Sequence, residues 1–179
     1  YTWDSLGFFY GQITELLGFK PHRHEGKVTG LAAYGDPTKC LEVMREMISF
    51  KDGRVLGQIG KYYKPFFYQQ TELLKEALKS FSREDIAAAA QKHFEEVTTE
   101  YIAYHARQNN ISTVVCAGGV FANVKLNERI RALSEVKELY VFPHMGDGGL
   151  SVGACYLSLA KRGLRPEPMS NVYLGTGTT

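Results

Sequence analysis

Two glycine-rich turns carry the residues of this sequence that are best suited to binding and catalysis. In the first, AGGVFAN at 117–123, Gly118 and Gly119 follow an apolar run, and Asn123 comes shortly after them. Paired glycines let the backbone approach a ligand closely, and a helix that follows offers unpaired N–H groups to an anion. The turn therefore predicts contact with a nucleotide, to which Asn123 would add a side-chain hydrogen bond. A glycine pair can equally serve only to make a tight turn.

The second turn, GDGG at 146–149, sets one carboxylate between glycines. Asp147 follows an apolar run and precedes a helix, so it is well placed for a divalent metal that bridges nucleotide phosphates, with Gly148 against the nucleotide. Asp147 as the N-cap of that helix is the alternative, and the two roles can coexist. Because one carboxylate does not complete a metal site, the other ligands must come from elsewhere.

A third segment, HEGKVTGLAAYG at 24–35, combines charges with small residues. Lys27 could contact a phosphate, and Glu25 could accept a hydrogen bond from a ribose hydroxyl. Gly26 and Gly30 would let a helix or turn pack very close to a neighbour. On chemistry alone, a close-packed helix with solvated charges explains this segment better than a ligand site.

The elements around the two turns predict an α/β fold with a parallel sheet. Residues 113–117 and 139–142 are short apolar runs typical of strands buried on both faces. Each is followed by a glycine-rich turn and a helix, at about 121–133 and 150–159. This order implies parallel strands with right-handed crossovers. Both turns then lie at the carboxyl ends of the strands, where open α/β sheets bind ligands.

The first two thirds of the chain predict mainly helices. Apolar spacing favours helices at 4–17 and 83–108, the second one capped by Ser82. A further helix is expected up to about Met47, with Asp36 as N-cap and Pro37 in its first turn.

Residues 48–56 predict a β-hairpin that turns at Asp52 and Gly53. Tyr62 to Tyr68 receive no assignment. His93 and His105 lie on the long helix, where we interpret them as packed or hydrogen-bonded side chains rather than metal ligands.

Composition argues against several classes of function. The net charge of the 179 residues is +2 and the charges are interspersed, unlike the clustered basic face of a nucleic-acid-binding protein. No apolar run reaches the length of a membrane span. Three separate cysteines in apolar segments, Cys40, Cys116 and Cys155, are interpreted as reduced core residues of a cytoplasmic protein.

The motifs resemble, in their order along the whole chain, those of the carbamoyltransferase family, which serves nodulation-factor, antibiotic and sugar-modifying pathways. The segments that carry the resemblance are SLGFFYGQITELLGF (5–19), HEGKVTGLAAYG (24–35), AGGVFANVKLNERI (117–130), FPHMGDGGLSVGA (142–154) and VYLG (172–175). The resemblance implies one lobe of an actin-like (ribonuclease-H-like) ATPase fold, a largely parallel sheet flanked by helices. The tRNA threonylcarbamoyladenosine synthesis protein shares this fold.

The resemblance also implies an activity. Carbamoyltransferases of this type make a carbamoyl-adenylate from carbamoyl phosphate and ATP, and then pass the carbamoyl group to a hydroxyl of a small-molecule acceptor. A divalent metal, iron by resemblance or else magnesium, sits at the nucleotide phosphates. The acceptor and the catalytic residues stay undetermined.

Residue by residue, the family pattern maps onto the same three segments. The family's metal-binding aspartate matches Asp147, and its nucleotide-binding double glycine and asparagine match Gly118, Gly119 and Asn123. Its glycine–lysine segment matches Gly26, Lys27 and Gly30. An aspartate that tRNA-modifying relatives carry on the first helix is Gly11 here, and neither His22 nor His24 stands where the family's metal histidines do.

We therefore expect the chain to be one lobe of a larger enzyme, inactive by itself. It begins at Tyr1 without a methionine, and neither a first lobe with the metal histidines nor a C-terminal domain is recognised in it. The alternatives are a lobe of an actin-like sugar or acetate kinase, the tRNA-modifying relative, and a nucleotide-binding lobe without catalysis.

Overall fold

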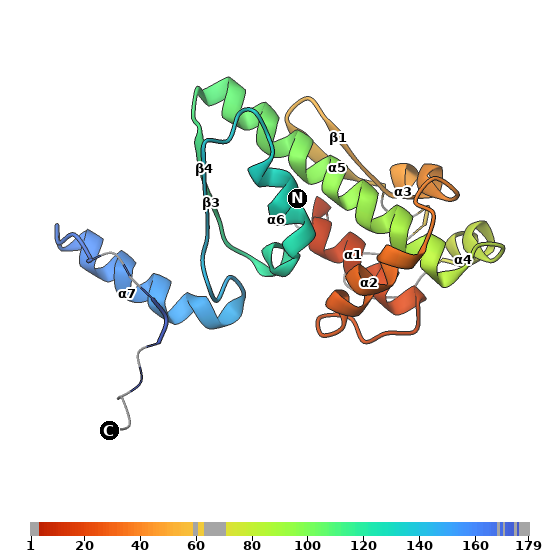
Figure 1. The fold of residues 1–179 in the computed structure, drawn as a ribbon, viewed down its shortest axis with the longest axis horizontal. Helices are drawn as coiled ribbons and strands as arrows, with labels where there is room; N and C mark the ends of the chain where they lie inside the picture. Colours follow the sequence, from red (N-terminus) through yellow and green to blue (C-terminus); the bar gives the residue numbers. More distant parts are fainter. Residues whose placement is uncertain are drawn as a thin grey trace.

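A central helix, α5 (Arg83–Asn109), is the element against which most of the others pack (Figure 1). The computed structural model describes residues 4–58, 61–62, 71–167, 169, 171–173 and 175. Ser82 caps α5 by accepting a hydrogen bond from the backbone N–H of Asp85, as predicted. Asn110 ends the helix in the left-handed conformation, with φ of 52°.

Three short helical elements cover one side of α5. They are α1 (Leu6–Leu16), α2 (Glu25–Leu31) and the 3-10 helix η2 (Ala32–Tyr34). The predicted first helix is confirmed: Ser5 caps it, and Gly18, with φ of 76°, follows its end. Phe9 and Ile13 of α1 are fully buried and belong to the same core as Phe94 of α5.

The predicted β-hairpin is confirmed and lies along α5. Strands β1 (Ile48–Lys51) and β2 (Arg54–Gly57) pair antiparallel, and their turn residues Asp52 and Gly53 both have positive φ. Two histidines of α5 form hydrogen bonds with backbone carbonyls of the hairpin. This confirms the interpretation of both as hydrogen-bonded side chains. His93 Nε2 lies 2.6 Å from the Ile48 carbonyl oxygen and His105 Nε2 lies 2.9 Å from that of Gly53.

The helix expected to start at Asp36 begins later, so that part of the prediction is wrong. Helix α3 runs over Leu41–Met47, and Asp36 instead accepts hydrogen bonds from the N–H and hydroxyl of Thr38. Asp85 is the reason, because its carboxylate accepts a hydrogen bond from the Asp36 N–H and one from Lys39 Nζ. These bonds hold the pKa of Asp85 at about 2 and fix a turn where a helix would start. A further helix, α4 (Glu72–Leu78), was not predicted.

The last third follows the predicted order of strand, turn and helix. Strand β3 (Thr113–Cys116) leads through the 3-10 helix η3 (Gly119–Ala122) into α6 (Val124–Arg131). Strand β4 (Glu138–Val141) leads through the 3-10 helix η4 (Asp147–Gly149) into α7 (Leu150–Lys161). The two strands pair in parallel, as predicted. In the described residues they form a two-stranded sheet of their own, separate from the hairpin, rather than one larger sheet.

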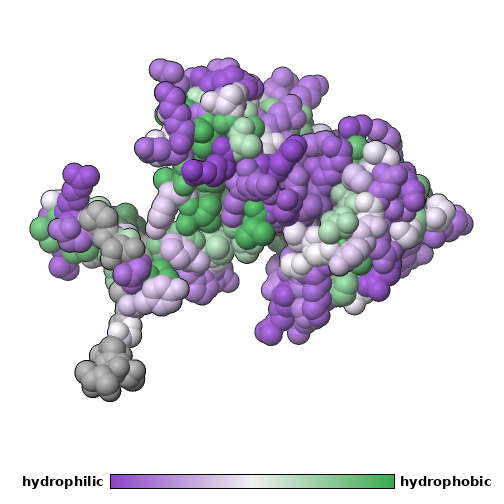
Figure 2. Space-filling view, in the orientation of Figure 1, coloured by the Kyte–Doolittle hydropathy of each residue, from purple (hydrophilic) through white to green (hydrophobic). Residues whose placement is uncertain are grey.

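The described residues cover one face of the β3–β4 sheet and leave the other exposed. Val114 and Leu139 pack against the core, whereas Val115 and Tyr140, paired on the other face, are 68% and 47% exposed. The expectation that both faces are buried is therefore wrong for the described residues. Helix α7 protrudes from the body (Figure 1) and also exposes apolar side chains, visible at the left of Figure 2.

The cysteines are described in full, and two of the three lie where the sequence predicts. All three cysteines are free, with Cys40 and Cys116 buried as expected but Cys155 exposed on α7. No described helix combines the length and the apolar character needed to cross a membrane. Most of the unassigned aromatic stretch, residues 63–68, lies outside the described residues, as does part of the VYLG segment.

Gly35 provides a test of how η2 packs on α5. A Cβ placed there would lie 2.0 Å from the carbonyl oxygen of Glu84, which is backbone and cannot move aside cheaply. We expect Gly35→Ala to lower the free energy of unfolding by about 3 kcal/mol or more, or to prevent folding. Gly30→Ala is the matched control, because a Cβ there meets no atom within 4 Å. Urea denaturation of both variants checks this, and equal stabilities would contradict the close approach.

Candidate nucleotide site

The two glycine-rich turns meet at the carboxyl ends of β3 and β4. The N–H of Gly118 donates to the carbonyl oxygen of Met145 at 2.6 Å, and the N–H of Phe142 donates to that of Cys116 at 3.2 Å. Parallel pairing of neighbouring strands brings the ends of both strands to one edge. The structure thus places the first turn directly beside the second, although they are separated by a helix in the sequence.

The two glycines of the first turn differ in their roles. Gly118 has φ of 116° and ψ of 152°, a conformation that side chains other than glycine rarely adopt. Gly119 has no positive φ, and a Cβ at that position would meet no atom within 4 Å. The backbone turn therefore needs Gly118 but not Gly119, and the space beside Gly119 is open.

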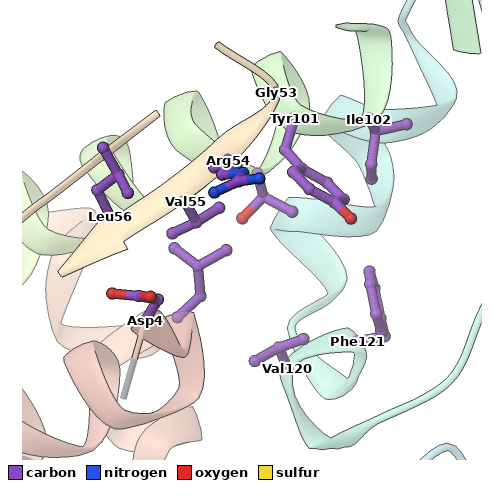
Figure 3. A pocket seen from close by; sticks show the side chains of 11 residues that line it. Asp4, Gly53, Arg54, Val55, Leu56, Tyr101, Ile102, Val120 and Phe121 are labelled. Atoms are coloured by element: carbon purple, nitrogen blue, oxygen red, sulfur yellow. The ribbon is translucent and has the colours of Figure 1, made fainter. Parts of the chain in front are cut away.

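The two residues after Gly119 line a cavity that the glycines do not reach. Val120 and Phe121 line an open, mainly apolar cavity of about 670 Å³ between η3, β2, α5 and the start of α1 (Figure 3). Asp4 and Arg54 bring the charged groups of its lining, and Asp4 accepts a hydrogen bond from the N–H of Gly57. Neither Gly118 nor Gly119 lines this cavity, so it is separate from the candidate site.

The second turn exposes its carboxylate. Asp147 is exposed at the start of η4, and α7 begins only at Leu150 with Gly149 in the cap position, so Asp147 does not cap that helix. The glycines here make room for His144. A Cβ on Gly148 would lie 2.3 Å from Nε2 of that ring, and one on Gly149 would lie 2.3 Å from the His144 carbonyl oxygen.

The two glycines of α2, Gly26 and Gly30, have open space beside them. A Cβ on Gly26 or Gly30 would meet no atom within 4 Å, so the expected close packing at these positions is wrong and occurs at Gly35 instead. Lys27 is exposed, with Nζ 5.8 Å from the centre of the Phe19 ring. The carboxylate of Glu25 accepts a hydrogen bond from the backbone N–H of His22.

Asn123 joins α2 to the first turn. It caps α6, with Oδ1 accepting from the N–H of Leu126 at 3.1 Å and from Gln91 Nε2 at 3.1 Å. Its Nδ2 donates to Thr29 Oγ1 at 3.2 Å and to Gln91 Oε1 at 2.9 Å. Thr29 belongs to the HEGKVTGLAAYG segment, and Met145 directly precedes the second turn. The Asn123–Thr29 and Gly118–Met145 hydrogen bonds therefore link all three predicted segments.

Sequence reasoning missed the residues that complete this connection. Tyr10 donates its hydroxyl to Gln91 Oε1 at 2.6 Å and lies 2.9 Å from Thr29 Oγ1. Burial raises the pKa of Tyr10, so its hydroxyl keeps its proton. A signal was available in IAAAAQ at 86–91, where one amide follows a run of apolar residues on a helix. Which partners that amide has could not be inferred from the sequence.

The metal-binding potential of the described residues rests on Asp147. Across those residues, no three side chains of His, Cys, Asp or Glu converge on one point. A lone, exposed carboxylate on a turn next to a second glycine turn fits one ligand of a shared metal, because oxygen is the donor that magnesium and ferrous iron accept.

The amino-acid sequence of the chain is similar to those of several known proteins. A family model described as "Carbamoyltransferase N-terminus" matches residues 1–156. The uncharacterized protein MJ1051 of Methanocaldococcus jannaschii is 38% identical over 96% of this chain, and nodulation protein NolO of Bradyrhizobium diazoefficiens is 28% identical over 96%. A tRNA N6-adenosine threonylcarbamoyltransferase of Fervidobacterium nodosum is 37% identical over 50% of the chain.

The matched regions are parts of longer proteins. The alignments cover 33% of MJ1051, 32% of NolO and 28% of the Fervidobacterium protein. The chain therefore spans about a third of the length of the curated relatives it matches.

The contrast between the two glycines of the first turn can be measured directly. We expect Gly118→Ala to lower the free energy of unfolding by about 1–3 kcal/mol, because alanine is strained at this positive φ. Gly119→Ala should stay within about 0.5 kcal/mol of the wild type, because its Cβ meets open space. Thermal unfolding of the two variants side by side gives the answer. The reverse ranking would show that the turn has another conformation in solution.

Proposed function

The chain belongs to the carbamoyltransferase family, and we propose that it forms one lobe of an actin-like ATPase that activates carbamoyl phosphate with ATP. The observation that carries the proposal is the meeting of three segments, 24–35, 117–123 and 144–149, through hydrogen bonds of Gly118 and Asn123. Glycine-rich turns at the carboxyl ends of parallel strands are suited to nucleotide binding.

The nucleotide would lie against the open glycines of these segments. Gly119, Gly26 and Gly30 leave space in which a ligand could contact the backbone, which supports a ligand role over close protein packing. Gly118 and Gly148 shape the two turns, Lys27 offers a cation to a phosphate, and Glu25 offers a carboxylate to a ribose hydroxyl. Asn123 belongs to the same site because it ends the double-glycine turn.

Asp147 would supply one metal ligand. An exposed carboxylate that does not cap α7 is free to bind a divalent cation, iron or magnesium, at the nucleotide phosphates. The metal would neutralise phosphate charge, while Asp147 fixes its position relative to the double-glycine turn.

The reaction proposed for the complete enzyme is ATP-dependent carbamoyl transfer. Carbamoyl phosphate and ATP would give a carbamoyl-adenylate, and a hydroxyl of a small-molecule acceptor would take the carbamoyl group. Two relatives are named nodulation proteins, and the family resemblance includes enzymes of nodulation-factor and antibiotic pathways, so we propose an acceptor from a pathway of this kind. We propose that the reaction takes place in the cytoplasm, where ATP is available, without nucleic acid or membrane as a partner.

Other parts of the same polypeptide would complete the cleft. Val115 and Tyr140 on the sheet, and Leu150 and Leu157 on α7, are large apolar side chains that are about half exposed or more. Parallel sheets are normally covered on both faces, so such a surface is suited to a first lobe, further strands or a C-terminal domain. The whole enzyme's activity would then require those parts.

If one wall of the cleft lies outside this chain, the chain should bind ATP weakly. Calorimetry with ATP and magnesium or ferrous iron is expected to give a dissociation constant no tighter than about high micromolar, since interactions shared between two lobes are lost. A nanomolar constant would show that the described segments form a complete site and would contradict the one-lobe proposal.

Asp147→Asn separates metal binding from a purely structural role. The change preserves size and hydrogen bonding but removes the charge, so the metal-dependent gain in ATP affinity should be lost while the melting temperature is unchanged. In the complete enzyme, most activity and bound metal should disappear as well. Asp52→Asn, in the exposed hairpin turn, is the control. Normal metal content and rate in Asp147→Asn would remove this residue from the site.

A further inference from the structure

A closed ring of hydrogen bonds lies behind the double-glycine turn, formed by four side chains from separate elements. We infer that three of its members, Tyr10, Thr29 and Gln91, are positioning residues of the nucleotide site, acting through Asn123. This inference rests on the proposed function, because it assumes that the turn before Asn123 binds a nucleotide. None of the three has to touch the ligand.

The direction of each bond follows from the fixed donors and acceptors at the edge of the ring. The N–H of Leu126 can only donate, so the atom of Asn123 facing it is the oxygen. The Glu95 carboxylate accepts from the Gln91 amide at 2.7 Å, so the Gln91 atom facing it is the nitrogen. Both amide orientations are thereby determined, and the two amides form a reciprocal pair.

The hydroxyl groups close the ring. Tyr10 gives its proton to Gln91 Oε1, so its oxygen can accept from the hydroxyl of Thr29, 2.9 Å away. Thr29 in turn accepts from Asn123 Nδ2. Its own proton has two acceptors in reach, the Tyr10 oxygen at 2.9 Å and the Glu25 carbonyl oxygen at 3.3 Å, and the nearer one closes the ring. Each side chain of the ring thus donates to one neighbour and accepts from another. Removing one hydroxyl takes one hydrogen bond from each of its two neighbours, which keep their bonds to the other members of the ring.

The ring uses the full hydrogen-bonding capacity of the Asn123 side chain. Both amide hydrogens donate to Thr29 and Gln91, and the oxygen accepts from Leu126 and Gln91. A ligand could therefore bind this amide only by breaking one of these bonds. Asn123 instead affects the site by where it holds the chain, four residues after Gly119.

The ring affects the proposed site because two of its members belong to two different segments of that site. Thr29 directly precedes Gly30 on α2, while Asn123 ends the turn that contains Gly119. The ring therefore sets the spacing between the helix that bears Lys27 and the double-glycine turn. Misplacement of binding groups by about 1 Å is enough to weaken their action on a ligand strongly.

Substitutions that remove single hydroxyls test the ring with little change of shape. Tyr10→Phe and Thr29→Val each delete one member, and Thr29→Ser restores a hydroxyl at the same place. The controls delete buried hydroxyls elsewhere. Tyr62→Phe removes a bond to Glu46, and Thr98→Val removes one to the carbonyl oxygen of Phe94 on α5. All variants are first compared by melting temperature, so that general destabilisation can be subtracted.

Two quantities are measured: the affinity for ATP, and the hydrogen-exchange rates of the Gln91 and Asn123 side-chain amides. In NMR titrations of the chain with ATP and magnesium, we expect Tyr10→Phe and Thr29→Val to raise the dissociation constant about threefold to tenfold, the size of one lost hydrogen bond. Thr29→Ser and both controls should bind like the wild type. The side-chain amide hydrogens of Gln91 and Asn123 should exchange slowly in the wild type and faster in the two ring variants.

Three other outcomes would be decisive. Equal ATP affinity in ring and control variants would overturn the positioning role and leave the proposed function intact. Loss of binding in Thr29→Ser as well as in Thr29→Val would overturn it too, because a retained hydroxyl would then make no difference. If the wild-type chain gives no ATP-dependent shifts at millimolar concentrations, the nucleotide site itself is contradicted, and the inference falls with it.

Discussion

The buried side-chain amide of Gln91 constrains how the helices can be arranged, because the helices must supply its hydrogen-bond partners. An amide that leaves water must find partners for its donors and its acceptor, because an unpaired polar group in a core is destabilising. Gln91 on α5 finds them on α1, at the start of α6 and on its own helix, through Tyr10, Asn123 and Glu95. Apolar packing brings the helices together, and these directional bonds select one relative placement.

The same bonds relate the fold to the candidate site. The apolar contacts of Phe9, Ile13 and Phe94 tolerate small shifts, since dispersion and burial depend weakly on direction. A hydrogen bond between Asn123 and Thr29 does not, because its strength falls steeply with distance and angle. The double-glycine turn is therefore located by polar contacts on one side and by the Gly118–Met145 bond on the other.

Glycine serves three physical roles in the motif segments. Gly118 supplies a backbone conformation that other residues adopt only under strain. Gly35 and Gly149 make room for neighbouring backbone, and Gly148 for a histidine ring. Gly26, Gly30 and Gly119 do neither, and their open surroundings distinguish them as positions where something outside the described residues can approach. Under the proposed function, a nucleotide would occupy this open space.

The sequence by itself determined the local elements and the family. The hairpin turn at Asp52–Gly53, the cap at Ser82 and the parallel order of strands and helices depend on neighbouring residues and were predictable. Asp36 was misread because its partner, Asp85, is 49 residues away. The Tyr10–Thr29–Gln91–Asn123 ring likewise joins residues 19 to 94 positions apart. Only the tertiary structure decides such pairings, since a side chain's hydrogen-bonding capacity can be read from its type but the identity of its partner depends on how distant helices pack.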